Sequence, residues 1–437
     1  MRPLIPARLR PYVVIPFLLA LLFASAVLFA HALLQKPSVQ KTLVQRLSTH
    51  TGYHVRTGRI ELSLWGGIGI QVHDLEAVSP DRAQSIQASR MHLTLNARAL
   101  LSGRIVPVGL ALIRPRIHVN PSAQGMDATL FTGGPWPVFW MPGLQSFSMQ
   151  KGSICFGDRP YGLESFSMDV RHHLINPLAL AVTASGTIAW PETSIPFRAR
   201  GKVDPLKGRE KTGSFQIHVN AGPVPAPRLP WPRDLPFEEG TVDAALTLEK
   251  AEGPGLMVSG RITGRDLVFD LVQPGQRKTF HLPEAAVALS GRTEGKQVHL
   301  PELTFTTGDL SSRLDLRIDL RNEENPRVHM RAETGFLPID SFCRFFPAPL
   351  LPPWVESRLF PLLQAGEARL EHLTLSGTLR DLENLGRPEH EDALSLSVAC
   401  RRFVVSGGGI PYPFRNVSAQ VRYEKGDLVI ADLNARL

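Results

Sequence analysis

The sequence predicts a mainly β protein whose strands follow one N-terminal transmembrane helix. The helix is predicted by an uncharged apolar run from Tyr12 to Leu34, which at about 1.5 Å per residue can cross a hydrocarbon core of roughly 30 Å. The strands are predicted by apolar residues at every second position through most of the remaining chain, the period of a strand with one buried and one solvated face. We therefore expect an anchor, a few short helices and an elongated, twisted antiparallel sheet.

The charges around the apolar run predict the orientation of the chain in a membrane. Arg2, Arg8 and Arg10 precede the run, and positive charge stays on the cytoplasmic side. Residues 1–11 are therefore predicted to be a cytoplasmic tail, 12–34 an anchor, and everything later to lie across the membrane. Small residues at 24–26 and 30–32 allow a cleaved signal peptide as the alternative, but signal peptides carry only about 7 to 15 apolar residues.

Composition excludes some classes of function. The chain has 437 residues, 43% of them hydrophobic, which is enough for a large core. The net charge of +8 does not gather into a basic stripe with interleaved aromatics, so nucleic acid is not an expected partner. Cys155, Cys343 and Cys400 are far apart in sequence and odd in number, so no complete disulfide framework is expected. Each lies beside apolar residues and is predicted to be a small core residue.

The chain is predicted to hold two β segments. Apolar residues at helical spacing predict a short amphipathic helix over 38–50, which Gly52 ends. Residues 35–221 then form a first β domain and residues 238–437 a second one. The proline-rich stretch 222–237 between them is predicted to be an extended linker. Two further proline-rich stretches lie at 134–143 and 346–353, and a short surface helix is predicted over 354–364.

No catalytic pattern is present in the sequence. The glycine-rich turns at 66–69 and 407–409 lack the Lys-Ser/Thr of a phosphate loop. His172-His173 and the polar segment 389–392 have no metal-ligand spacing that outweighs an ordinary strand or a solvated loop. Nucleophile-elbow and HExxH motifs are absent as well. We predict no enzyme activity, no catalytic residues, no metal and no cofactor.

The order of elements resembles the N-terminal region of the AsmA-like family. In that pattern a Thr-Gly-x-x-Val element (51–55) ends the first helix, a leucine pair precedes a glycine (100–103), and a Pro-x-Ile-x-Val strand closes the segment (115–119). The segment 354–382, a tryptophan helix before a glycine-initiated strand, is similar to larger YhdP-type members. Together these matches cover about a quarter of the chain.

The resemblance implies an intermembrane lipid-transfer protein. It implies a taco-like β groove, anchored in the inner membrane of a Gram-negative envelope and lying in the periplasm, that conducts phospholipid acyl chains and serves outer-membrane biogenesis. The implied partners are phospholipids, the inner membrane and an outer-membrane or periplasmic protein. About 20 strands at roughly 4.8 Å give a length on the order of 100 Å, which is short for a complete bridge. We therefore expect either part of a longer polypeptide or a short member that needs a partner.

Strand residues predicted to face the groove are the candidate lipid contacts, although each also fits a plain sheet core. They are Leu62, Leu64, Ile68, Ile70, Leu93, Leu95, Leu316 and Ile318. Headgroups are expected to stay outside such a groove, with weak headgroup selectivity. The alternative function is a non-catalytic envelope scaffold that assembles outer-membrane proteins along an exposed strand edge.

Overall fold

The computed structural model describes residues 35–436 except 65–66, 82, 103, 105, 121–143, 158–161, 173–178, 191–192, 205–213, 230–236, 251–254, 274–275, 323–324, 346–359, 384, 386–387 and 408–409. The predicted cytoplasmic tail and anchor lie outside the described residues. Within the described residues no helix is both long and apolar enough to span a membrane. The chain is mainly β with a few short helices, as the alternation predicted. It divides into two compact units, Met1–Pro191 (unit 1) and Glu192–Leu437 (unit 2).

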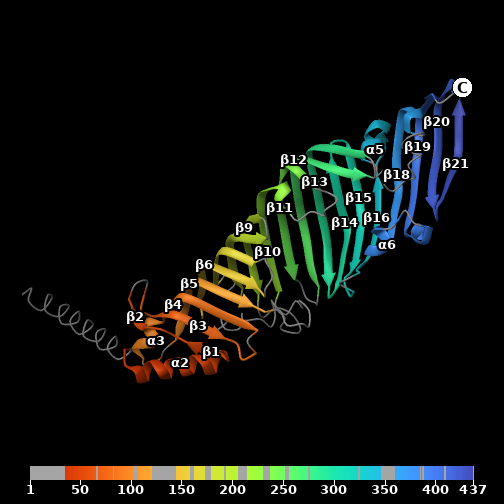
Figure 1. Cartoon of the computed structure of the whole chain (residues 1–437). Helices are drawn as coiled ribbons and strands as arrows, with labels where there is room; N and C mark the ends of the chain where they lie inside the picture. The colour runs from red at the N-terminus through yellow and green to blue at the C-terminus, as the bar shows by residue number, and fades with distance from the viewer. Residues whose placement is uncertain are drawn as a thin grey trace, which may run out of the picture. The chain divides into compact units, whose positions relative to one another are not determined.

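Unit 1 runs from red to yellow in Figure 1. Its described elements are α2 (Pro37–Thr51), β1 (His54–Arg56), β2 (Ile60–Ser63), β3 (Gly69–Val78), β4 (Gln84–Leu95), α3 (Ala97–Leu101), β5 (Pro107–Val119), β6 (Ser146–Phe156), β7 (Gly162–His172) and β8 (Leu180–Trp190). Strands β1 and β2 both pair with β3, and the ladder then continues in chain order to β8. Pairing is antiparallel except between β5 and β6, which are parallel. The register of this parallel pair runs from Gly109 with Ser146 to Val119 with Phe156.

The helix after the predicted anchor is confirmed. Helix α2 begins with Pro37 at its N-terminus and ends at Gly52, which has a φ of 73°. Glycine adopts this left-handed conformation without steric cost and is therefore a common helix stop. The hydroxyl of Ser48 accepts a hydrogen bond from Val55 N at 3.2 Å, which ties the helix to β1.

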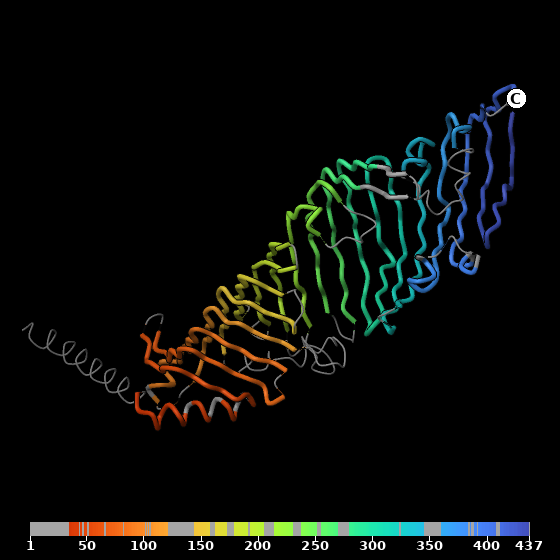
Figure 2. Tube along the Cα trace, in the orientation of Figure 1, coloured from red at the N-terminus to blue at the C-terminus, as the bar shows by residue number. Residues whose placement is uncertain are grey.

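Unit 2 is a longer antiparallel meander with a few short helical segments. Its described elements are β9 (Thr193–Asp204), β10 (Ser214–Pro225), η2 (Ala226–Arg228), β11 (Phe237–Lys250), β12 (Leu256–Gln273), β13 (Gln276–Glu294), β14 (Gln297–Thr307), β15 (Leu310–Asp319), β16 (Arg327–Thr334), β17 (Leu337–Pro338), α5 (Ile339–Phe345), η5 (Phe360–Leu362), β18 (Leu363–Thr378), α6 (Leu379–Glu383), η6 (Pro388–Ala393), β19 (Leu394–Gly407), β20 (Ile410–Glu424) and β21 (Asp427–Arg436). Each strand pairs with the next, except that β16 and β17 both pair with β18. Figure 2 shows these strands side by side in chain order.

Lines of β-bulges cross the strands of unit 2. Gly222, Gly240 and Asp266 have φ of 99°, 108° and 50° and lie at or beside register shifts in β10, β11 and β12. A second line crosses β18 to β21 at Gly366, Arg402, Asn416 and Asp432. A bulge bends its strand and increases the local twist. Bulges that line up across neighbouring strands therefore curve the sheet along that line.

The boundary between the units differs from the predicted linker. Residues 222–225 belong to β10, which pairs with β11 through a bulge, and Ala226–Arg228 form η2. Proline is tolerated in a strand at bulges and at positions that need no N–H donor, so residues 222–225 continue the sheet. The division falls instead at Pro191 and Glu192, between two strands. The other two proline-rich stretches and most of the predicted 354–364 helix lie outside the described residues.

Candidate functional site

A continuous row of apolar residues crosses the whole sheet of unit 2. Each member is the direct register partner of the next across neighbouring strands. This central apolar row consists of Ala199, Val219, Leu246, Gly260, Leu289, Leu303, Leu314, Ala332, Leu373, Leu396, Tyr423 and Leu428. Because side chains alternate between the two faces of a strand, the row marks one face of the sheet as apolar, and we call it the apolar face of unit 2.

Burial along the central apolar row is uneven. From β9 to β15 its members are only partly buried, although most are aliphatic. Ala332, Leu373 and Leu396, further along the row, are 4–6% exposed. Along the central apolar row the face is therefore half-buried over β9 to β15, which we call the half-open stretch, and buried over β16 to β19, which we call the covered stretch. Beside the row, Ala226 of η2 forms a second buried cluster with Leu267, Leu282 and Ala285 of β12 and β13.

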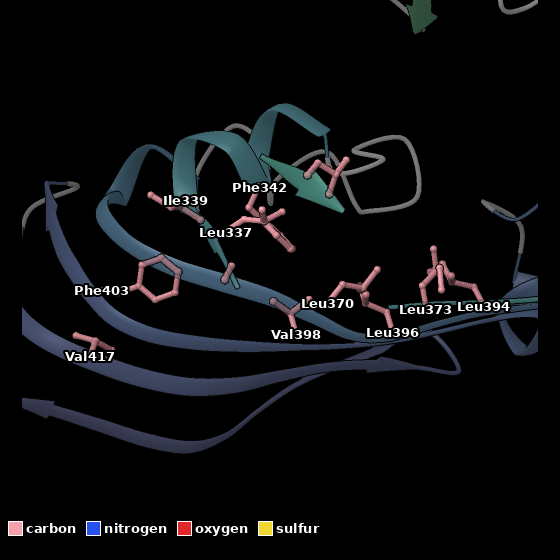
Figure 3. Close-up of a cluster of buried hydrophobic side chains, with 13 residues drawn as sticks. Leu337, Ile339, Phe342, Leu370, Leu373, Leu394, Leu396, Val398, Phe403 and Val417 are labelled. Atoms are coloured by element: carbon pink, nitrogen blue, oxygen red, sulfur yellow. The ribbon is translucent and has the colours of Figure 1, made fainter. Parts of the chain in front are cut away.

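Helix α5 covers the apolar face at β18 and β19. Leu337, Ile339 and Phe342 of the β17–α5 segment are buried in one cluster with residues of these two strands, including Leu370 and Phe403. Figure 3 shows Leu337, Ile339 and Phe342 at the helix facing the strands, with Leu373, Leu394 and Leu396 further along the strands. The covered stretch is thus an ordinary packed core.

Glycines allow the closest backbone approaches within this face. A Cβ built on Gly260 would lie 2.2 Å from the carbonyl oxygen of Ala245, and one on Gly366 would lie 2.4 Å from the ring of Phe403. Both glycines have positive φ, 151° and 134°. A side chain at either position would push neighbouring strands apart.

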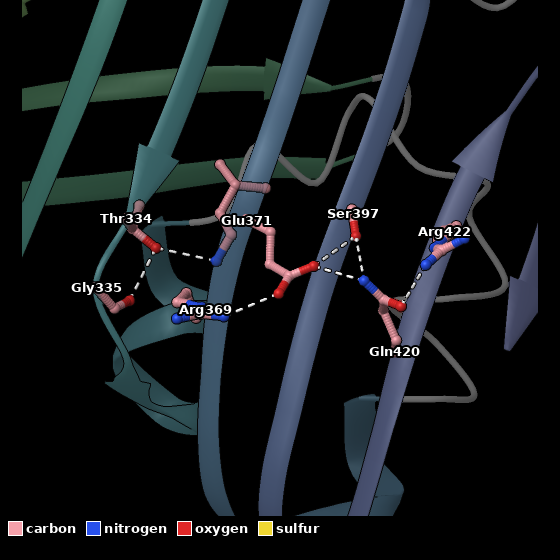
Figure 4. Close-up of polar contacts among 8 residues, drawn as sticks. Thr334, Gly335, Arg369, Glu371, Ser397, Gln420 and Arg422 are labelled. Carbon is pink, nitrogen blue, oxygen red and sulfur yellow. Dashed lines mark hydrogen bonds and ion pairs between the residues drawn. The ribbon is translucent and has the colours of Figure 1, made fainter. Parts of the chain in front are cut away.

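The opposite face of the sheet is polar. Glu371 on β18 accepts hydrogen bonds from Arg369 Nη2 (2.8 Å), Ser397 Oγ (3.0 Å) and Gln420 Nε2 (2.6 Å). Figure 4 shows this network across β18, β19 and β20. The bond from Arg369, followed by those from Gln420 and Ser397, lowers the pKa of Glu371. Three strands are therefore tied together on the face away from α5.

Two of the three cysteines confirm the core prediction. Cys343 on α5 and Cys400 on β19 pack against the same cluster, although they are far apart in sequence. Burial, with a smaller contribution from Cys343, raises the pKa of the Cys400 thiol to about 12, so it stays protonated and behaves as a small apolar group. The prediction is wrong for Cys155, which is exposed because it points to the outer face of β6.

The predicted lipid contacts fall into the two units. In unit 1, Leu62, Ile70 and Leu93 are register partners in one partly buried row. Leu95 is 6% exposed, at the end of β4. Leu64 and Ile68 lie just outside β2 and β3, and Leu64 is 47% exposed.

In unit 2, Leu316 and Ile318 lie on β15, on the same apolar face as Leu314 of the central apolar row. Sequence reasoning missed helix α5 and most of the central row. The alternation of each strand was visible, but the partners across strands depend on bulges that shift the register. The segment 339–345 is too short to display a helical period.

Comparison with family models, curated proteins and solved structures found no match to this chain. Its function must therefore be argued from the two faces of its sheets.

Proposed function

We propose that this protein binds phospholipid acyl chains on the apolar face of unit 2 and moves phospholipid between the inner and outer membranes of a bacterial envelope. One observation carries the proposal: the central apolar row is continuous from β9 to β21 yet only half-buried over β9 to β15. A contiguous apolar surface that stays partly exposed to water is typical of a site that binds an apolar ligand or partner. An acyl chain is such a ligand, and binding it needs no catalytic group.

The membrane location in this proposal is inferred from the sequence. The apolar run 12–34 would hold the chain in the inner membrane, with the β units in the periplasm. The resemblance to the AsmA-like family supports the same setting and a part in outer-membrane biogenesis. The bulge lines of unit 2, which curve a sheet, also agree with a groove.

Site-specific photo-crosslinking in cells that produce the full chain tests the proposal. The probe is placed at Leu289 and Leu303 of the central apolar row, and at Ser290 and Thr304, the next residues on the same strands, as controls. We expect phospholipid adducts at the two leucine positions and none at the controls. Adducts to protein alone at the leucine positions would mean that the half-open stretch is a packed core, and would refute the proposal.

The edge of unit 2 favours the scaffold as a second candidate function. Val429 and Ile430 on β21 are each 53% exposed, and Leu433 is 65% exposed. In the described part of the chain β21 pairs with β20 alone, so a partner could add a strand there. Crosslinks from Val429 to an envelope protein, together with silent positions at Leu289 and Leu303, would favour this function over lipid transport.

A further inference from the structure

Strand β9 presents a row of three basic side chains on the polar face of unit 2. Arg198, Arg200 and Lys202 occupy every second position of the strand and are all exposed, whereas Ala199, between the two arginines, belongs to the central apolar row. Alternate residues of a strand share a face and lie about 6.6 to 6.8 Å apart. The three positive charges therefore form one line along β9, which we call the basic strip.

Strand β10 places no carboxylate opposite the basic strip. The register partners of its three members, in order, are Asn220, His218 and Gln216. The imidazole of His218 lies at hydrogen-bond distance, 2.9 Å, from the hydroxyl of Thr247 on β11. Opposite charges on facing positions of neighbouring strands stabilise a sheet, and β10 does not supply them here.

Carboxylates near the basic strip offset only part of its charge. Asp204, two residues beyond Lys202 at the end of β9, can offset one of the three charges. Glu249 of β11 is the register partner of Gln216, so it lies two strands from Lys202, at about 10 Å. In the described part of the chain, no member of the basic strip has a hydrogen bond or ion pair. A net positive charge therefore remains on β9.

Two arginines elsewhere on the polar face of unit 2 show the contrasting arrangement. Arg292 lies 3.4 Å from Glu294, and Arg313 lies 3.6 Å from Glu333. Their charges are compensated within the sheet, whereas the neighbouring charges of the basic strip repel one another. An exposed line of like charge is recognised by a partner of opposite charge.

The spacing of the basic strip indicates the class of partner. It equals the spacing of alternate side chains in an extended polypeptide, so a segment with Asp or Glu at every second position can place one carboxylate against each cation. Arginine binds a carboxylate through two parallel hydrogen bonds. A flat anionic bilayer fits less well, because Asp204 and Glu249 flank the basic strip on the same face and would meet the lipid phosphates.

We propose that the basic strip is a docking surface for an extended acidic segment of another protein, which lies along β9 with carboxylates at alternate positions. The segment binds on the polar face, so the apolar face stays available and the inference does not depend on lipid binding. It also differs from strand addition at β21, because the contacts are made by side chains of β9 and not by the backbone of an edge strand.

Equilibrium binding of fluorescent peptides to the full chain in detergent, at low ionic strength, tests the inference. One peptide alternates glutamate with serine, and the other has the same composition with its glutamates in one block. The test variant is Arg198→Gln/Arg200→Gln/Lys202→Gln. The control, Arg292→Gln/Arg313→Gln/Arg331→Gln, removes the same charge from the same face of three other strands. All six positions are exposed, so both variants are expected to fold, which circular dichroism checks.

We expect the wild type to bind the alternating peptide about fivefold more tightly than the block peptide. The test variant should bind the alternating peptide about tenfold more weakly than the wild type, the loss of three exposed ion pairs. The control variant should lose less than about twofold. A further variant, Arg198→Lys/Arg200→Lys, keeps the charges and should stay within about threefold of the wild type.

Several outcomes would overturn the inference. Equal losses in the test and control variants, or equal binding of the two peptides, would reduce the effect to the general positive charge of the chain. Failure of the wild type to bind either peptide would have the same consequence. Vesicles of phosphatidylglycerol are the last probe: if they bind the wild type and not the test variant while the peptides do not bind, the basic strip contacts a membrane surface and not an acidic protein.

Discussion

The two units use the same local pattern with opposite results for burial. In unit 1, Ile60, Val72, Met91, Leu112 and Met149 are successive register partners, and all are 1–8% exposed. In unit 2 the corresponding central apolar row is half-buried over β9 to β15. Alternation therefore decides which residues face one side of a sheet, but it does not decide whether that side is covered.

The covered stretch of unit 2 is the part that resembles unit 1. Under α5, Leu370, Leu373 and Leu396 reach the burial of unit 1 core residues. The two units therefore differ in what covers the apolar side chains and not in the alternation of their strands. Substitutions in the covering segment or in the apolar rows should change this difference in burial.

The largest effect is expected where α5 meets the sheet. Phe342 is 7% exposed in the cluster that also contains Leu370 and Phe403. Phe342→Ala should weaken the local stability of α5 on β18 by about 4 kcal/mol, through lost burial and a residual cavity. Hydrogen exchange of peptides from α5 and β18 measures this free energy of opening.

The same variant should make the covered stretch behave like the half-open one. A photo-crosslinking probe at Leu370, silent toward lipid in the wild type, should then form phospholipid adducts. Asp340→Ala, an exposed position on α5, is the matched control. Unchanged exchange in α5 would show that Phe342 does not hold the helix in place.

A matched pair of leucines compares the two rows directly. Leu112 in unit 1 is 2% exposed, whereas Leu303 in the central apolar row is only partly buried. Leu112→Ala should cost about 3 kcal/mol and Leu303→Ala about 1 kcal/mol, because less apolar surface and less packing are lost from a half-open face. Local opening of β5 and β14, read by hydrogen exchange, provides the comparison, and equal costs would contradict the difference in cover.

Much of the fold was predictable because the alternation of apolar and polar residues within one strand shows which side chains share a face. The alternation around 314–320 predicted β15 and placed Leu316 and Ile318 on one side, and Gly52 marked the end of α2. The candidate contacts of unit 1 were placed on the apolar side as well, but Leu95 is buried and Leu64 lies beyond the strand.

The remaining features depend on contacts between distant residues. No local sequence pattern reveals the parallel pairing of β5 with β6. Cys343 and Cys400 meet only because α5 folds onto β19.

The glycine of the central apolar row distinguishes it from the unit 1 row, which has a side chain at every position. Gly260 lies between Leu246 and Leu289, and its Cβ would lie 2.2 Å from Ala245 O. Gly260→Ala should cost about 2 kcal/mol through backbone strain, seen as faster exchange in β11 and β12. Gly335→Ala, where a Cβ would meet nothing within 4 Å, should be neutral or slightly stabilising; a similar cost at both positions would argue against the close approach.

The smallest effect concerns the polar face of the covered stretch. The pKa of Glu371 is lowered, chiefly by the Arg369 hydrogen bond, so its stabilisation is present above the unfolded glutamate pKa of about 4.3 and is lost as pH falls through the folded value. The side chain is 26% exposed, and solvent screening limits the contribution to about 0.5 kcal/mol.

Glu371→Gln should therefore lower the opening free energy of β19 slightly at pH 7 and reduce its decline between pH 7 and pH 3. Glu424→Gln, at an exposed position on β20, should leave both unchanged. If the opening free energy of β19 declines with pH identically in wild type and Glu371→Gln, the charge of Glu371 does not contribute to stability and its hydrogen bonds only orient the side chains. Side-chain stabilisation at this end of the sheet would then come from the apolar cluster under α5. Unit 1 is stabilised in the same way, by its buried apolar row.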